Sequence, residues 1–186
     1  MSLLACDELI IEKEDEGHIT LLIDICIGSN GADYDVANVV YTMFKHQYCY
    51  HTTKNKWYIF KEDECKWECS KDVVLQLRKL IYKVIYGRFI ARANYWHQQA
   101  MIYNAEEDST QNDACQLKSK KCMEISLKLK KLSFNDSIIK LCMVLFTNPK
   151  FEELLMEEEE KPLKDENKNL KNEIKNLKNE IKNLKN

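Results

Sequence analysis

The chain has 186 residues, of which 45% are apolar, enough for one domain with a hydrophobic core and a further segment. The formal net charge of −2 favours no class of binding partner by itself. Neither a run of about 18 apolar residues nor a basic, apolar leader is present, so we expect an intracellular protein without a membrane partner.

The charges are distributed unevenly along the chain. Residues 1–33 carry eight acidic side chains and one lysine, whereas residues 71–150 carry fourteen lysines and arginines and seven acids. This asymmetry indicates a basic face on the second stretch. One interpretation is that acidic residues 1–16 cover that face when no nucleic acid is bound.

Eight cysteines occur, most of them within apolar patterns. They are Cys6, Cys26, Cys49, Cys65, Cys69, Cys115, Cys122 and Cys142. Without a secretory leader they predict reduced thiols rather than a disulfide framework. The alternative is a zinc site built from Cys49, His51, Cys65 and Cys69, whose spacing is not a standard ligand pattern, so we predict no metal and no other cofactor.

Residues 1–33 are predicted to form an acidic N-terminal segment with one short strand. The apolar run Ile19–Ile27 has strand character, and residues 28–31 end it. Asp33 is then expected to cap a helix over Tyr34–His46. The apolar side chains of that helix recur at helical spacing and are Val36, Val39, Val40, Met43 and Phe44.

Residues 47–68 are rich in aromatic side chains and predict a small antiparallel β-meander. Polar turns at 53–56 and 62–64 separate its strands. We expect Trp57 and Trp67 to lie in the core, and Tyr50 and Tyr58 to be more exposed. The alternative is that the rings form a platform on which nucleobases stack.

A long helix is predicted over Lys71–Ile102, capped by Ser70, with Gly87 permitting a bend. Ala105–Asn112 then predicts an exposed loop, and Asp113–Lys131 a further helix.

Two capping patterns follow. Ser133, with an acid three residues later, resembles a capping box that opens a helix through Phe146. Asn148-Pro149 is expected to open a short last helix, with asparagine as the cap and proline at the first helical position.

Basic side chains on these helices and on the 53–56 turn are the main functional indication. Lysines and arginines that neutralise phosphates release counterions, which gives sequence-independent and salt-sensitive binding. The predicted DNA-binding residues are Lys54, Lys56, Arg78, Lys79, Arg88, Arg92, Lys118, Lys120, Lys121, Lys128, Lys130 and Lys131. The alternative is a solvated helix surface.

The composition changes after residue 156. An acidic run, Glu157–Glu160, precedes apolar residues four and three apart, which is typical of a coiled coil. The predicted oligomerisation residues are Leu163, Asn167, Leu170, Ile174, Leu177, Ile181 and Leu184. Isoleucine at position a with leucine at d favours a homodimer, and the alternative is a solvated tail without a partner.

Two blocks of the sequence resemble a known family. The first is YDVANVVYTMFKHQYCYHTTKNKWYIFKEDECKWE, whose matching positions are Asp35, Val36, Ala37, Lys54, Asn55, Lys56, Trp57, Tyr58, Phe60 and Trp67. The second is CMEISLKLKKLSFNDSIIKLCMVLFTNPKFEELL, whose matching positions are Leu127, Lys128, Phe151 and Glu152. Over Tyr34–Leu155 the chain resembles the region that precedes the superfamily-three helicase in primase-helicases of phages, plasmids and large nucleocytoplasmic DNA viruses.

The resemblance implies a non-catalytic connector or collar that helps to assemble a helicase ring and to guide DNA. It also implies a replicative helicase or primase as a partner, and a viral replication site or the host cytoplasm or nucleus as the location. Family members place a primase before this region and an ATPase after it. This sequence contains no G-x-x-x-x-G-K-[ST] phosphate loop, and Asp24 lacks the second acid of a polymerase metal site, so we expect no enzyme activity.

The sequence therefore predicts a mainly α (α+β) fold. A helicase-associated helical domain over 34–156 contains the meander near residues 47–68, and residues 157–186 form an acidic linker and a coiled coil. The predicted function is a DNA-replication-associated module that assists oligomer assembly and DNA binding. The alternative is a stand-alone coiled-coil interaction or scaffold protein with no role on DNA.

Overall fold

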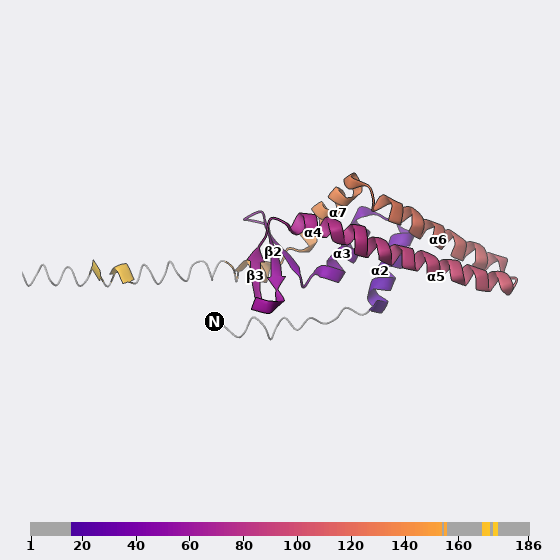
Figure 1. The fold of residues 1–186 in the computed structure, drawn as a ribbon, viewed down its shortest axis with the longest axis horizontal. Coiled ribbons are helices and arrows are strands. Elements are labelled where there is room, and N and C mark those ends of the chain that lie inside the picture. Colours follow the sequence, from indigo (N-terminus) through magenta and orange to yellow (C-terminus); the bar gives the residue numbers. More distant parts are fainter. Residues whose placement is uncertain (1–15, 154, 156–168, 172, 175–186) are drawn as a thin grey trace, which may run out of the picture. The chain divides into compact units, whose positions relative to one another are not determined.

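The computed structural model describes residues 16–153, 155, 169–171 and 173–174, and the chain divides into two units, Met1–Thr147 and Asn148–Asn186. The described part is mainly helical with one small three-stranded antiparallel sheet, as the sequence predicted (Figure 1). The first unit contains α2 (Glu16–Gly28), α3 (Asp33–Phe44), β1 (Tyr48–His51), β2 (Lys56–Lys61), η1 (Glu62–Glu64), β3 (Lys66–Cys69), α4 (Val73–Leu80), η2 (Ile81–Ile85), α5 (Tyr86–Ala105), α6 (Ser109–Lys128) and α7 (Leu132–Leu145).

The strand predicted over Ile19–Ile27 is wrong, because these residues lie within the helix α2. A short, β-branched apolar run fits either a strand or a buried helix, and packing decides between them. Here α2 packs on α3, α5 and α6. Ile19, Ile23 and Cys26 are buried at helical spacing, while Leu21 and Ile25 remain exposed on the outer face.

The chain leaves α2 through two residues in the left-handed region. Asn30 has a φ of 55° and Gly31 a φ of 70°, and the Gly31 N–H donates to the Cys26 carbonyl over 2.7 Å. The predicted cap at Asp33 is wrong, since Ala32 takes the cap position and Asp33 is the first helical residue. The helix itself matches the predicted one to within two residues at its C-terminal end.

The β-meander is confirmed, with strand order β1-β2-β3 and both pairs antiparallel. Asn55 (φ 51°) supplies the left-handed residue of the first turn, and Cys65 (φ 46°) that of the second. The register places Tyr50 opposite Trp57 and Phe60 opposite Trp67.

Phe146, just after α7, joins the sheet to the helices. Its ring lies 5.2 Å from that of Tyr41 on α3 and 5.7 Å from that of Trp57 on β2, both edge to face. Its carbonyl accepts the Tyr50 N–H of β1 over 3.0 Å. The sheet is therefore fixed to the helical core by both ring packing and a backbone hydrogen bond.

The long helix is confirmed and runs from Val73 to Ala105 as α4, η2 and α5. The predicted cap at Ser70 is wrong, because the helix begins later and the Ser70 hydroxyl accepts only the Asp72 N–H, over 3.2 Å. The irregularity expected at Gly87 lies earlier, in the π-helical turn η2, where the Tyr86 N–H donates to the Ile81 carbonyl five residues back.

Helices α5 and α6 lie side by side as a long antiparallel hairpin (Figure 1). The loop predicted over Ala105–Asn112 is wrong, since only residues 106–108 connect the two helices. Asp108 caps α6 by accepting the Gln111 N–H over 3.0 Å. The buried Asn112 donates its amide to the Ala100 carbonyl over 2.8 Å, which ties the first turn of α6 to α5.

The capping box predicted at Ser133 is also wrong. Helix α7 begins at Leu132, with Lys131 in the cap position and no side-chain cap. The Asp136 carboxylate, expected to serve that box, instead accepts a hydrogen bond from the Arg78 guanidinium on α4 over 2.7 Å. The Asp136 side chain therefore forms a long-range ion pair instead of the cap that the local pattern predicts.

In the second unit, the helix predicted after Asn148 is confirmed. The Asn148 side chain accepts the N–H groups of Lys150 and Phe151, and Pro149 is the first helical residue. Of the predicted coiled coil, Leu170 and Ile174 are helical and about half exposed. The other predicted coiled-coil positions lie outside the described residues.

We expect Gly31→Ala to lower the free energy of unfolding by about 2 kcal/mol or more. A Cβ at this left-handed position would lie 2.7 Å from Ile125 Cγ1 on α6. The matched control is Gly87→Ala, whose Cβ meets no atom within 4 Å and which should raise stability by about 0.5–1 kcal/mol. Urea denaturation of both variants measures this, and equal effects would contradict the tight packing of Gly31.

Candidate nucleic-acid interface

The three predicted DNA-binding arginines all take part in ion pairs. Arg88 forms a two-bond fork with Glu16 at 2.7 Å for each bond, and Arg92 forms a similar fork with Asp24. Forked pairs of this kind are the strong form of the charge-assisted hydrogen bond. Both forks join α5 to α2, so these two arginines hold the fold together.

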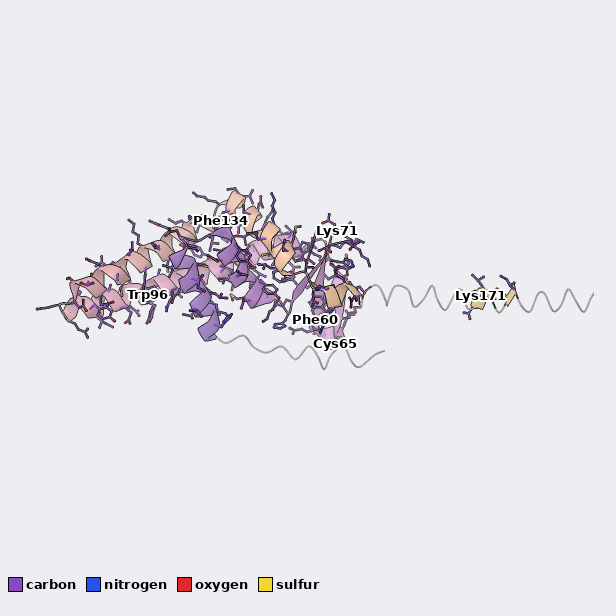
Figure 2. The ribbon with its side chains drawn as sticks, turned by 180° about the vertical axis from the view of Figure 1, so that it is seen from behind. Phe60, Cys65, Lys71, Trp96, Phe134 and Lys171 are labelled. Carbon is purple, nitrogen blue, oxygen red and sulfur yellow. The ribbon has the colours of Figure 1, made fainter. Side chains whose placement is uncertain are left out.

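Arg92 also belongs to a cation–π cluster. Its guanidinium lies 4.6 Å from the ring centre of Trp96, and the Lys118 ammonium lies 4.0 Å from the same ring. Trp96 lies on α5, at the other end of the first unit from Phe60 of β2 and from Cys65 in the turn before β3 (Figure 2). This contact holds Lys118 against α5. The position of Lys118 is therefore explained without a phosphate bound to it.

The remaining α6 lysines differ in their surroundings. Lys128 donates its ammonium to the Asn30 carbonyl over 2.7 Å and so fastens the α2–α3 connection. Lys120 is exposed and Lys121 is half-buried, both on α6, and Lys131 is exposed just before α7. These predicted lysines therefore differ in exposure and in the contacts that they make.

Four cations do come together, in an open hollow of about 290 Å³ at the turn η2. The lining side chains come from α4, η2, the α6–α7 connection and α7, and the polar ones are Arg78, Lys79, Tyr82, Lys83, Lys130 and Asn135. Leu132 adds an apolar wall. We call this hollow the basic groove. None of the described residues that line it is acidic.

The cations of the basic groove are held differently. Arg78 is paired with Asp136 at 2.7 Å, and the Lys130 ammonium lies over the Tyr86 ring at 4.6 Å. Lys79 and Lys83 are exposed, and neither has an ion-pair partner in the described part of the chain. Net positive charge therefore concentrates here, and the groove walls raise the local concentration of anions.

Two residues that line the groove each have a buried polar atom without a hydrogen-bond partner in the described structure, Arg78 Nε and Asn135 Oδ1. The Asn135 amide nitrogen donates to the carbonyls of Leu129 (2.7 Å) and Lys131 (3.3 Å). Rotating the amide would place its oxygen against those two carbonyls, so the oxygen is held as the open acceptor. Arg78 supplies a donor and Asn135 an acceptor at the same site.

The predicted hairpin residues lie elsewhere. Lys54 is half-buried in the β1–β2 turn and Lys56 is exposed at the start of β2, and neither lines the basic groove. The expectation that Tyr50 and Tyr58 are exposed is wrong, since they are only 8% and 7% exposed. Tyr50 packs on Trp57 at 5.0 Å between ring centres, and all four residues of β1 are buried.

The cysteines follow the prediction, because none of the seven in the described part of the chain is in a disulfide. Cys49 and Cys69 flank Tyr58 from opposite neighbouring strands. Among the described residues, no group of three or more histidine, cysteine, aspartate or glutamate side chains is arranged to hold a metal ion.

Sequence reasoning missed Tyr82, Lys83, Leu132 and Asn135 as parts of the site. Lys79 and Lys83 are four residues apart, which is a visible signal of a shared helix face. The contribution of α7 had no such signal, because Leu132 and Asn135 reach the groove only through the packing of α7 on α4.

Comparison with protein-family models, with curated proteins and with solved structures found no match for this chain. Over the described residues, no helix combines the length and apolar character needed to cross a membrane.

We expect alkylation at about pH 8 to modify the exposed Cys65 and Cys69 well before Cys26 and Cys142. Burial raises the pKa of Cys26 and of Cys142 from the ordinary 9.0 to about 12, and the Asp35 carboxylate adds to the effect at Cys26. Neutral thiols therefore stabilise the fold fully below pH 9, and this contribution is lost as pH rises through about 12.

Mass spectrometry of alkylated peptides over time measures the order of reaction. The control is the same reaction in denaturant, where all cysteines should react at similar rates. Modification of Cys26 as fast as Cys65 in the native chain would contradict the burial of Cys26.

Proposed function

We propose that this chain is a non-catalytic, nucleic-acid-binding module of DNA replication. The observation that carries the proposal is the basic groove, where four cations from α4, η2 and the α6–α7 connection line one hollow. The resemblance of Tyr34–Leu155 to the connector or collar region of primase-helicases supports the same function. In that role the chain assists assembly and holds DNA, while other polypeptides perform the chemistry.

The groove suits a phosphate backbone better than a single small anion. Lys79 and Lys83 are exposed. Lysine binds phosphate as a point charge without a fixed geometry. Arg78 is already paired with Asp136, so it contributes only part of its charge. Binding should therefore be independent of sequence and sensitive to salt.

An ion pair with Glu16 reduces the number of predicted cations that are accessible to a nucleic acid. Its carboxylate forks onto Arg88, so an acid of the N-terminal stretch covers one of the predicted cations. The proposed cover by residues 1–15 lies outside the described part of the chain. The groove cations Lys79 and Lys83 are left as the accessible ones.

We expect Lys79→Gln and Lys83→Gln each to lower the slope of log affinity against log salt by about 1, because each removes one phosphate contact. Fluorescence anisotropy of a labelled DNA across a salt series measures the slope. The matched control is Lys120→Gln on α6, a predicted DNA-binding residue that does not line the groove. An equal loss in all three variants would assign binding to the general charge of the chain, and the groove would lose its role.

The heptad repeat supports the oligomeric part of the proposal. Leu170 and Ile174 occupy the d and a positions, and both are helical with about half of their surface exposed. Apolar side chains left exposed on a helix at this spacing are buried when two helices supercoil. The same observation favours the second candidate function, a coiled-coil scaffold protein with no role on DNA.

We expect Ile174→Asp combined with Ile181→Asp to convert a dimer of the full chain to a monomer, because charges at a positions oppose helix pairing. Light scattering with mass determination measures the change. The matched control is Asn172→Asp with Asn179→Asp, which adds the same charge at the outward f positions and should leave the dimer intact. A wild-type chain that is monomeric would contradict the dimer directly.

The same experiments separate the two candidate functions. A dimer that binds no DNA at low salt would favour the scaffold protein. Salt-dependent binding that survives loss of the dimer would show that DNA binding does not require dimerisation.

A further inference from the structure

An exposed aromatic ring stands among the cations of the basic groove. Tyr82, within the π-helical turn, is 53% exposed. Its ring is nearly parallel to that of Tyr86, with an angle of 19° and 6.5 Å between ring centres. The Lys130 ammonium covers the Tyr86 ring, so Tyr82 carries the accessible aromatic surface of the pair.

An exposed ring beside cations is the combination that binds unpaired bases. Successive bases stack on aromatic side chains while basic residues follow the backbone. In a duplex the base faces are covered by neighbouring base pairs, and only their edges reach a protein. A ring in this position therefore distinguishes single strands from duplexes.

Two buried atoms without a hydrogen-bond partner among the described residues also favour an unpaired base. Asn135 is 7% exposed, and its oxygen is fixed as an acceptor, while Arg78 Nε is a donor. The Watson–Crick edge of an unpaired base presents both donors and acceptors, and in a duplex these are consumed by the opposite strand. Asn135 Oδ1 and Arg78 Nε, on two residues that line the groove, supply one acceptor and one donor of the kind that the edge of an unpaired base requires.

From these contacts we propose that the basic groove is a binding site for single-stranded nucleic acid. One base stacks on Tyr82, its edge faces Asn135 and Arg78, and the adjoining phosphates lie against Lys79 and Lys83. The proposal rests on the proposed function and narrows it, since salt-dependent binding alone requires no preference between strands.

The test compares an oligothymidine of about 16 nucleotides with a duplex of the same length, using anisotropy with the full chain. The wild-type chain should bind the single strand more tightly. Tyr82→Leu should weaken single-strand binding about fivefold or more and duplex binding less than about twofold, since stacking acts only on unpaired bases. Leucine keeps an apolar side chain at the position, so loss of folding is not the expected cause.

The matched control is Tyr34→Leu on α3, because Tyr34 is 55% exposed and does not line the groove. It should leave both affinities unchanged. A second measurement is photocrosslinking of an oligonucleotide containing halogenated deoxyuridine, in which the adduct is expected on the peptide that carries Tyr82.

The outcomes separate this inference from the proposed function. Equal salt-dependent affinity for both forms, with no effect of Tyr82→Leu, overturns the single-strand site and leaves general DNA binding in place. An adduct confined to peptides outside the groove overturns it as well. Failure to bind either form overturns both proposals.

Discussion

The spacing of buried residues along the longest helix constrains the rest of the structure. From Val73 to Phe89 a fully buried apolar residue recurs at every fourth position. In a regular α-helix each such step turns the side chain by about 40°, so four steps would move it about 160° away from the core. The π-helical turn Ile81–Ile85 is wider and absorbs part of this drift. The core thus requires the irregular turn, and that turn carries Tyr82 and Lys83 into the basic groove.

A second constraint is the placement of α2, whose charges decide which cations stay accessible. Asp24 and Glu16 on α2 form forks with Arg92 and Arg88 on α5. Guanidinium groups suit such two-bond contacts, whereas ammonium groups do not. Arginines therefore hold the helices together, while lysines such as Lys83 are left toward solvent. Because these arginines are paired, fewer cations are accessible in the fold than the sequence predicts, and the accessible ones include those of the basic groove.

The sequence predicts the elements whose signals are local. The meander, the α3 pattern and the cap at Asn148 depend on neighbouring residues, and all three are confirmed. The errors arise where a distant partner decides. Ile19–Ile27 is helical because of packing against three other helices, and Asp136 pairs with Arg78 rather than capping α7. The groove could be predicted only in part, since Lys79 is visible in the sequence while Asn135 reaches the site through the packing of α7.

The residues that carry the family resemblance bear on the fold more than on binding. Val36 and Ala37 are fully buried, and Trp57 is only 6% exposed. These side chains build the core and the sheet, and they offer little surface to a nucleic acid. Support for the proposed DNA binding therefore comes from other, exposed residues such as Lys83 and Tyr82, which lie between the two blocks. The proposed function therefore rests on the basic groove itself, whose lining includes Lys130 and Asn135 from within the second block as well as Lys83 and Tyr82.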